Sequence, residues 1–325
     1  MNAQVFQGDA LHLAGSLASD SIDAVITDPP YGLKFMGKGW DHGVPGVEFW
    51  LEALRVLKPG GHLLAFGGTR THHRLMVAIE DAGFEIRDCL MWLYGQGFPK
   101  SLDVSKAIDK AAGAERERIP ASGGLHNNRN LNDDGWKNIG DAGAMMDSST
   151  PATEAAQQWD GWGTALKPGW EPIIMARKPL GKNTVAANVL TYGTGAINID
   201  GCRIGDEILP EQTAGQARIG TLERTDMVTP ERVGRWPANV MLDEDAAAIL
   251  DDQVGNRPGC KSPSTAKPES KFRPGQGNYQ GQGPIYGDDG GPSRFFYTAK
   301  ASRKERGEGN NHPTVKPITL MRWLC

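Results

Sequence analysis

The tetrapeptide Asp28-Pro29-Pro30-Tyr31 places a carboxylate, two rigid residues and an aromatic ring directly after an apolar segment. That segment, residues 22–27 (IDAVIT), predicts a buried strand that the tetrapeptide ends. The four residues are therefore expected at the C-terminal edge of a sheet, where open α/β sheets bind their ligands. Such an arrangement suits holding a flat base that carries an exocyclic amino group.

The chemistry that these residues can support is methyl transfer to the amino nitrogen of a nucleobase. That nitrogen is a poor nucleophile because its lone pair is delocalised into the ring, and two acceptors on its N–H groups would draw it towards a tetrahedral form. The Asp28 side chain and the Pro29 carbonyl can be these acceptors, aimed by the fixed proline backbone. Tyr31 can stack on the base, which is worth about 1–3 kcal/mol. Attack on a sulfonium methyl then needs in-line positioning, without a metal.

Strand and helix patterns alternate along residues 1–112 and predict a parallel α/β sheet. A helix with apolar residues from Val47 to Leu57 should end at Lys58-Pro59-Gly60-Gly61, before a strand at 62–66. A second helix around 75–79 should end near Gly83, before a strand at 84–93. Further along, residues 171–177 predict a strand that returns to the sheet, and residues 318–324 a helix that follows Pro317.

Composition limits the classes of partner. The 325 residues suffice for one large or two modest domains, and the net charge of -4 means that DNA contacts would have to come from local basic patches. The four cysteines are scattered without a C-x-x-C pair, which argues against a structural zinc and fits a reducing cytosol. No leader or apolar run of membrane-spanning length occurs, so a cytoplasmic protein without metal or membrane partner is expected.

The chain resembles the amino-directed DNA methyltransferases, which make N6-methyladenine or N4-methylcytosine. It is similar to their permuted β group, in which the catalytic motif precedes the main cofactor motif. The resemblance covers residues 4–112, 163–181 and 294–325 and rests on four segments: Gly8-Asp9-Ala10, Asp28-Pro29-Pro30-Tyr31, Lys58-Pro59-Gly60-Gly61 and His312-Pro313-Thr314-Val315-Lys316-Pro317. It implies an α/β fold with a Rossmann-like methyltransferase sheet, incomplete at the C-terminus, and a loop-rich inserted region.

The resemblance also divides the chain into parts. They are a catalytic half (1–112), a loop-rich insert (113–162), a returning core strand (163–181), a candidate target-recognition insert (182–293), and a basic segment that starts the cofactor-binding half (294–325).

S-adenosylmethionine is the cofactor that the resemblance implies. Asp9 and Ala10 would lie near its adenosine end together with Asp28, although Asp9 is equally compatible with a simple strand-end turn. The motif residues on the cofactor side would be His312, Pro313, Thr314, Lys316 and Pro317. The N–H groups of the helix after Pro317 would face the cofactor carboxylate, unless the segment is only a capping loop.

Double-stranded DNA is the expected partner, and its target base should be flipped into the pocket. Trp92, Phe98 and Lys100 lie in a stretch similar to the one that flanks the flipped base, although such aromatic residues are more often core. Basic residues beside aromatic ones suit phosphate and base contacts, or else form a solvated face: Arg294, Lys300, Arg303, Lys304 and Arg306. A homodimer and a cognate restriction enzyme are further partners that the sequence leaves open.

One departure from the family pattern concerns the glycine turn Asp-Pro-Phe-x-Gly-Ser-Gly-Thr, which should follow the cofactor-side motif. The sequence ends at Cys325 without it. Truncation is the simplest expectation, with a split gene or an inactive copy as alternatives. The predicted function is methylation of adenine N6, favoured over cytosine N4 by the resemblance, since an Asp at the head of the motif, here Asp28, goes with adenine in this family. The alternative from another class is a DNA-binding fragment or subunit without activity of its own.

Overall fold

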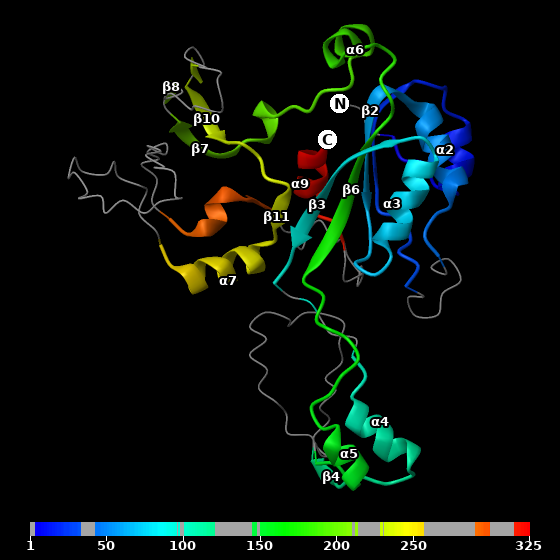
Figure 1. Cartoon of the computed structure of the whole chain (residues 1–325), viewed down its shortest axis with the longest axis vertical. Coiled ribbons are helices and arrows are strands. Elements are labelled where there is room, and N and C mark those ends of the chain that lie inside the picture. The colour runs from blue at the N-terminus through cyan, green and yellow to red at the C-terminus, as the bar shows by residue number, and fades with distance from the viewer. Residues whose placement is uncertain are drawn as a thin grey trace, which may run out of the picture. The chain divides into compact units, whose positions relative to one another are not determined.

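The computed structural model describes residues 4–33, 43–95, 97, 101–120, 145–147, 150–209, 212–213, 228–229, 231–256, 290–299 and 315–325. Two compact units share the chain (Figure 1). Unit 1 comprises Met1–Gln96, Gly169–Glu305 and Lys316–Cys325. Unit 2 comprises Gly97–Pro168 and Arg306–Val315, a wider range than the insert predicted at 113–162.

A six-stranded sheet forms the centre of unit 1, with the order β1-β2-β6-β3-β11-β12. The strands are β1 (Ile22–Thr27), β2 (Leu57–Phe66), β6 (Trp170–Arg177), β3 (Glu85–Leu93), β11 (Val240–Leu242) and β12 (Tyr297–Thr298). The pairs β1–β2, β3–β11 and β11–β12 are parallel, whereas β6 is antiparallel to both β2 and β3. The predicted α/β class is confirmed, and the strand β6 does return to the sheet.

The orientation of β6 corrects the expectation of a parallel sheet. After β3 ends at Leu93, the Tyr94 N–H donates to the carbonyl of Gly169 at 3.0 Å, directly before β6 begins. The chain therefore leaves the sheet and re-enters it at the same edge. A strand that re-enters at the edge where its predecessor ended must run in the opposite direction, as in a hairpin with a very long loop.

Strand β2 begins earlier than predicted because the Lys58–Gly61 segment forms a bulge within it. Helix α2 (Val47–Val56) ends as expected, but Leu57 already pairs with Ile22, and pairing resumes between His62 and Ala24. The four bulged residues oppose Asp23 alone, and Gly60 adopts φ +83°, which disfavours any side chain there. The buried Asn188 amide of α6 (Val185–Tyr192) donates to the Pro59 carbonyl at 2.8 Å and stabilises the bulge.

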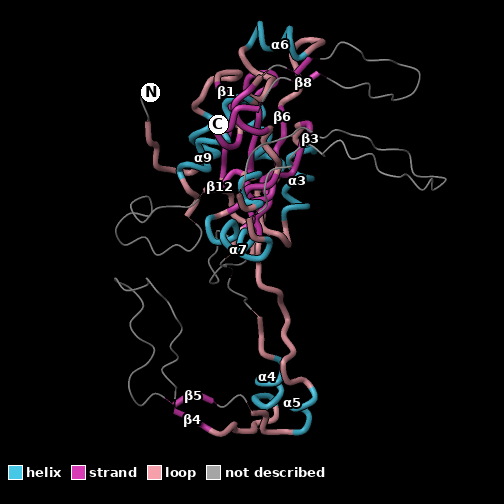
Figure 2. The backbone as a smooth tube through the Cα atoms, turned by 90° about the vertical axis from the view of Figure 1, so that its left-hand side faces the viewer, coloured by secondary structure: helices cyan, strands magenta, loops and turns pink. Residues whose placement is uncertain are grey.

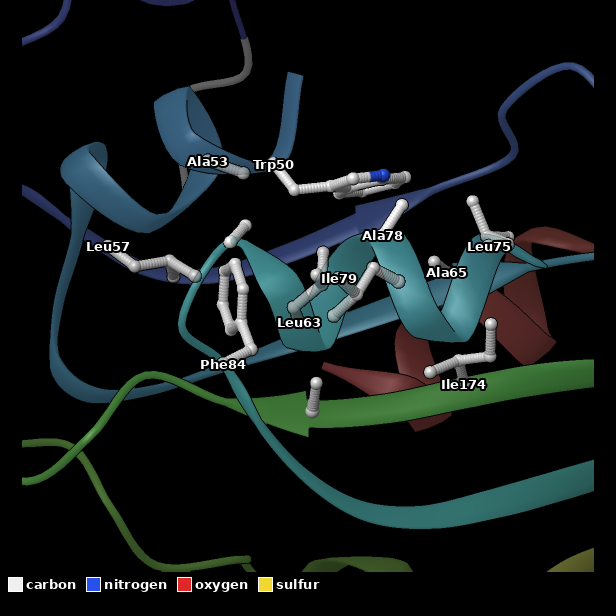
Figure 3. Packing of buried hydrophobic residues seen from close by; sticks show 12 residues of the cluster. Trp50, Ala53, Leu57, Leu63, Ala65, Leu75, Ala78, Ile79, Phe84 and Ile174 are labelled. Carbon is white, nitrogen blue, oxygen red and sulfur yellow. The ribbon is translucent and has the colours of Figure 1, made fainter. Parts of the chain in front are cut away.

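Successive residues of the central strands alternate between two core layers. Leu63 and Ala65 of β2 face α2 and α3 (His72–Asp81), and Figure 3 shows α3 lying over them. Leu64 and Phe66 face the opposite layer, which contains Leu320 of α9 (Ile318–Leu324). In Figure 2 the strands accordingly run between α3 and α9. The alternation follows from the two-residue period of a strand, and helices cover both faces of the sheet.

Unit 1 has further elements outside the central sheet and the helices described so far. They are α1 (Ala10–Gly15), α7 (Glu244–Val254), the short 3-10 helices Asp200–Cys202 and Pro292–Phe295, the pair β7 (Ile204–Leu209) and β10 (Arg232–Arg235), and the pair β8 (Gln212–Thr213) and β9 (Val228–Thr229). Within the described part of the chain, no helix has the length and apolar character needed to span a bilayer.

Unit 2 contains α4 (Val104–Ala111), α5 (Glu154–Gln158) and the paired strands β4 (Arg118–Pro120) and β5 (Met145–Asp147). A buried carboxylate joins its helices. Asp109, which is 1% exposed, accepts from Arg116 Nε at 2.7 Å, from Ala152 N at 3.0 Å and from the Thr153 hydroxyl at 2.8 Å. Burial alone would raise the pKa of Asp109, but these hydrogen bonds and the guanidinium lower it.

Acid should therefore weaken unit 2 through Asp109. Because the pKa is lower in the folded than in the unfolded chain, the stabilisation is present above about pH 4, the unfolded value, and is lost as the pH falls through the folded pKa. We expect Asp109→Asn to lower the melting temperature at pH 7 and to reduce its fall on acidification, measured by circular dichroism. Asp160→Asn, at an exposed position of the same unit, is the matched control. If acidification lowered the melting temperature equally in the wild type, Asp109→Asn and Asp160→Asn, this role of Asp109 would be contradicted.

Candidate active site

The predicted tetrapeptide follows β1 at the edge of the sheet where β1 and β2 both end. Pro29 is buried, whereas Asp28 remains exposed, with 38% of its side-chain surface accessible. The Thr71 hydroxyl, at the start of α3, donates to the Tyr31 carbonyl at 2.6 Å. The segment is thus fixed from both sides while its carboxylate faces solvent.

The Tyr31 hydroxyl lies between two carboxylates. It donates to Asp28 Oδ1 at 2.7 Å and lies 3.3 Å from Glu171 Oε2 on β6. Burial, followed by the negative charges of Glu171 and Asp28, raises the pKa of Tyr31 far above its ordinary value. The phenol therefore stays neutral at any physiological pH and holds one oxygen of Asp28 in place.

Lys316 completes this cluster from the segment that precedes α9. Its ammonium lies 2.7 Å from Glu171 Oε2, 3.3 Å from Asp28 Oδ2 and 3.1 Å from the Tyr31 hydroxyl. Only 6% of the side chain is accessible, and its nitrogen also lies 4.9 Å from the centre of the Phe66 ring and 5.9 Å from that of Trp92. The three donors of the ammonium thus each have an acceptor.

A cavity of about 380 Å³ lies beside the tetrapeptide. It is lined by Asp9, Ala10, Leu11, Pro30, Pro45, Gly46, Glu48 and Phe49. Pro30 lines the cavity and directly precedes Tyr31 of the charged cluster, so the cavity and the cluster are neighbours. Asp9 also caps α1, because its Oδ1 accepts from His12 N at 3.0 Å. No strand precedes Asp9 in the described residues, so Asp9 is a helix cap on the cavity wall and not the strand-end turn that the sequence left open.

The structure brings several predicted site residues together. Asp28, Tyr31 and Lys316 form one cluster, Asp9, Ala10 and Pro30 line one cavity, and Pro317 caps α9. Trp92 is buried in the second core layer, 8% exposed, with its ring near the Lys316 ammonium. Nine predicted residues lie outside the described part of the chain: Phe98, Lys100, Lys300, Arg303, Lys304, Arg306, His312, Pro313 and Thr314.

Arg294 takes part in a local structure of its own. Its guanidinium donates to the carbonyls of Gly290 and Gly291 and lies 4.5 Å from the centre of the Phe295 ring. The contact to DNA predicted for Arg294 stays a prediction.

Glu171 is the residue of the cluster that sequence reasoning missed. It is 7% exposed and forms the shorter of the two ion pairs of Lys316. A signal was available, because Glu171 interrupts the otherwise apolar run of residues 170–176 near its start. A carboxylate in a buried strand requires a hydrogen-bond or ion-pair partner. When that partner comes from a distant segment of the chain, the pair indicates a candidate functional site.

Basic residues at the start of α3 were missed as well. Arg70, His73 and Arg74 are exposed, and within the described residues the two arginine side chains have no carboxylate partner. The first turn of α3 contains no acidic residue, although positive charge at a helix N-terminus costs about 0.3–1 kcal/mol. The two arginines therefore add positive charge next to the tetrapeptide at a cost to helix stability.

Comparison with known proteins places the cluster in a family. The model of the DNA methylase family, the N6/N4 methyltransferases, matches residues 22–324, which include Asp28, Glu171 and Lys316. The chain belongs to the DNA methylase family. The resemblance to amino-directed DNA methyltransferases is thereby confirmed.

Individual relatives of this DNA methylase are more distant. Type II methyltransferase M.HindIII of Haemophilus influenzae is 25% identical over 237 residues, covering 60% of this chain and 64% of its own. M.HpaI of Haemophilus parainfluenzae is 32% identical over 122 residues, covering 34% and 37%. The chain thus spans less than two thirds of the length of these curated relatives. The solved PvuII DNA methyltransferase (cytosine-N4-specific) is 13% identical, covers 76% of each chain and has a TM-score of 0.28.

Proposed function

We propose that this DNA methylase transfers a methyl group from S-adenosylmethionine to the exocyclic amino group of a base flipped out of double-stranded DNA. The observation that carries the proposal is the exposed Asp28 carboxylate, which is held by Tyr31 and stands next to the cavity lined by Pro30. An acceptor at a fixed position beside a binding cavity is what activation of an amino nitrogen requires.

The cavity is suited to the nucleoside end of the cofactor. Its volume of about 380 Å³ falls in the range of small-molecule sites, and its walls are largely apolar, as a purine ring requires. Two carboxylates, Asp9 and Glu48, line it and can accept from an adenine amino group or ribose hydroxyls. When bound, S-adenosylmethionine supplies an electrophilic methyl group on a sulfonium.

The residues of the tetrapeptide would act on the amino nitrogen. Asp28 accepts one N–H hydrogen bond and the Pro29 carbonyl the other, so that the lone pair becomes available for attack. As the nitrogen–carbon bond forms and the carbon–sulfur bond breaks, Asp28 is the nearest base for the released proton. Tyr31 remains neutral because of its raised pKa, and its hydroxyl keeps Asp28 in place throughout.

Adenine N6 is the favoured acceptor because Asp28 heads the motif, in keeping with the tendency of the family. The test is transfer of labelled methyl from S-adenosylmethionine to duplex DNA, followed by digestion and identification of the labelled nucleoside. N6-methyl-2′-deoxyadenosine is expected. Label in N4-methyl-2′-deoxycytidine would instead identify cytosine N4 as the acceptor. DNA binding without methyl transfer would favour the alternative of a DNA-binding subunit.

The basic residues at the start of α3 provide a prediction about the DNA partner. We expect Arg70→Ala with Arg74→Ala to weaken DNA binding roughly tenfold and to reduce the salt slope by about 2, since each phosphate contact contributes about 1. Fluorescence anisotropy at several salt concentrations measures both. Arg87→Ala, at an exposed position on β3, serves as control. An unchanged salt slope in the double variant would place the DNA elsewhere.

A further inference from the structure

We propose that Glu171 is a positioning residue that takes the charge of Lys316 and thereby leaves Asp28 able to accept from the target amino group. The inference rests on the proposed methyl transfer and adds a residue to it. Glu171 lies on β6, 140 positions along the chain from Tyr31, and among the described residues it meets the tetrapeptide at the Tyr31 hydroxyl and through Lys316.

The distances in the cluster favour Glu171 as the partner of Lys316. The ammonium lies 2.7 Å from the Glu171 carboxylate and 3.3 Å from that of Asp28. A charge-assisted hydrogen bond has its usual length at about 2.7–2.9 Å, so the first pair is a full bond and the second is long. One ammonium between two carboxylates leaves one negative charge, and the geometry assigns it to Asp28.

Burial separates the roles of the two carboxylates. The Glu171 side chain is 9% accessible, whereas that of Asp28 is 38% accessible and can meet a substrate. Glu171 is held in place by its strand, because its register partner on β3 is Trp92 and the next residue, Pro172, accepts from Gly67 N at 3.0 Å. A fixed, buried carboxylate can hold an ammonium without approaching the reacting atoms.

Loss of Glu171 would transfer the ammonium to Asp28. Asp28 is then the one carboxylate of the described residues that still pairs with Lys316, so the ammonium would shorten its contact to Asp28 Oδ2 while Tyr31 still occupies Oδ1. Both oxygens would then be engaged in strong hydrogen bonds, and the carboxylate would compete poorly for an N–H group of the base. The defect should lie in turnover rather than in binding, because Glu171 does not face the cavity lined by Pro30.

The test compares Glu171→Gln with the double variant Glu171→Gln/Lys316→Met. We expect Glu171→Gln to lower kcat for methyl transfer by about 10–100-fold, with KM for DNA and cofactor within about twofold. The double variant also lacks the ammonium. Its kcat should be at least about tenfold higher than that of Glu171→Gln, because Asp28 is then free to accept from the base. A residue of merely structural importance would give a double variant that is no better. A double variant no more active than Glu171→Gln would overturn the proposal.

Two further measurements complete the design. Glu85→Gln, which breaks the ion pair with Arg177 at the other end of β6, is the matched control and should leave kcat unchanged. Thermal denaturation gives a readout that needs no turnover: the effect of Lys316→Met on Tm should be coupled more strongly to Glu171→Gln than to Asp28→Asn. Stronger coupling to Asp28 would refute the role of Glu171. A wild-type protein without methyl transfer but with the expected coupling would refute the proposed function alone.

Discussion

Asp28→Ala is expected to lower kcat for methyl transfer by at least about 10²–10³-fold, the cost of removing one preorganised group that stabilises the transition state. DNA binding should be largely kept, because the carboxylate contributes no positive charge to phosphate contacts. Labelled methyl incorporation measures the first quantity and fluorescence anisotropy the second. Asp28→Asn should be similarly impaired, since the amide oxygen keeps an acceptor but loses the charge that strengthens the bond.

Asp23→Ala is the matched control for this prediction. Asp23 lies on β1, is 73% accessible at its side chain and pairs with Lys58 at the surface. Exposed pairs of this kind contribute about 0–1 kcal/mol, so the control should retain both activity and stability. If Asp28→Ala kept most of its turnover, the assignment of Asp28 as an acceptor for the amino group would be wrong.

Trp50→Ala should lower the free energy of unfolding by about 3–5 kcal/mol, the usual cost of removing a large buried aromatic side chain. Trp50 of α2 is fully buried against α3 (Figure 3). Its indole N–H donates to the Pro45 carbonyl at 3.2 Å. Pro45 and Phe49, which directly precedes Trp50 in the sequence, both line the cavity. Cofactor affinity should therefore fall together with the free energy of unfolding. Denaturant titration and calorimetry measure the two effects.

Leu51→Ala provides the comparison on the same helix. Leu51 is 51% exposed and lies next to Trp50, so its loss should cost much less free energy. Equal destabilisation by the two substitutions would mean that the packing of α2 on α3 does not depend on Trp50. If Trp50→Ala lost stability but kept its cofactor affinity, the cavity would not depend on the contact between Trp50 and Pro45.

The elements of the catalytic half were predictable because their signals are local. The apolar run before Asp28, the helical spacing from Val47 and the glycine near the end of α3 each lie within one segment. The antiparallel direction of β6 was not predictable from its own residues, because it depends on where the chain re-enters the sheet. The early start of β2 was missed for a related reason, since a bulge exists only relative to a partner strand.

The sequence alone predicted Asp28 as the candidate acceptor at the sheet edge, because strand, proline pair and tyrosine lie within ten consecutive residues. Only the tertiary structure revealed that Lys316 reaches Asp28 and that Glu171 pairs with the same ammonium. These residues come from β6 and from the segment before α9, and electrostatic interactions depend on distance in space rather than on separation along the chain. Local pattern therefore pointed to Asp28 as the candidate acceptor, whereas the long-range return of two segments set the charges around it.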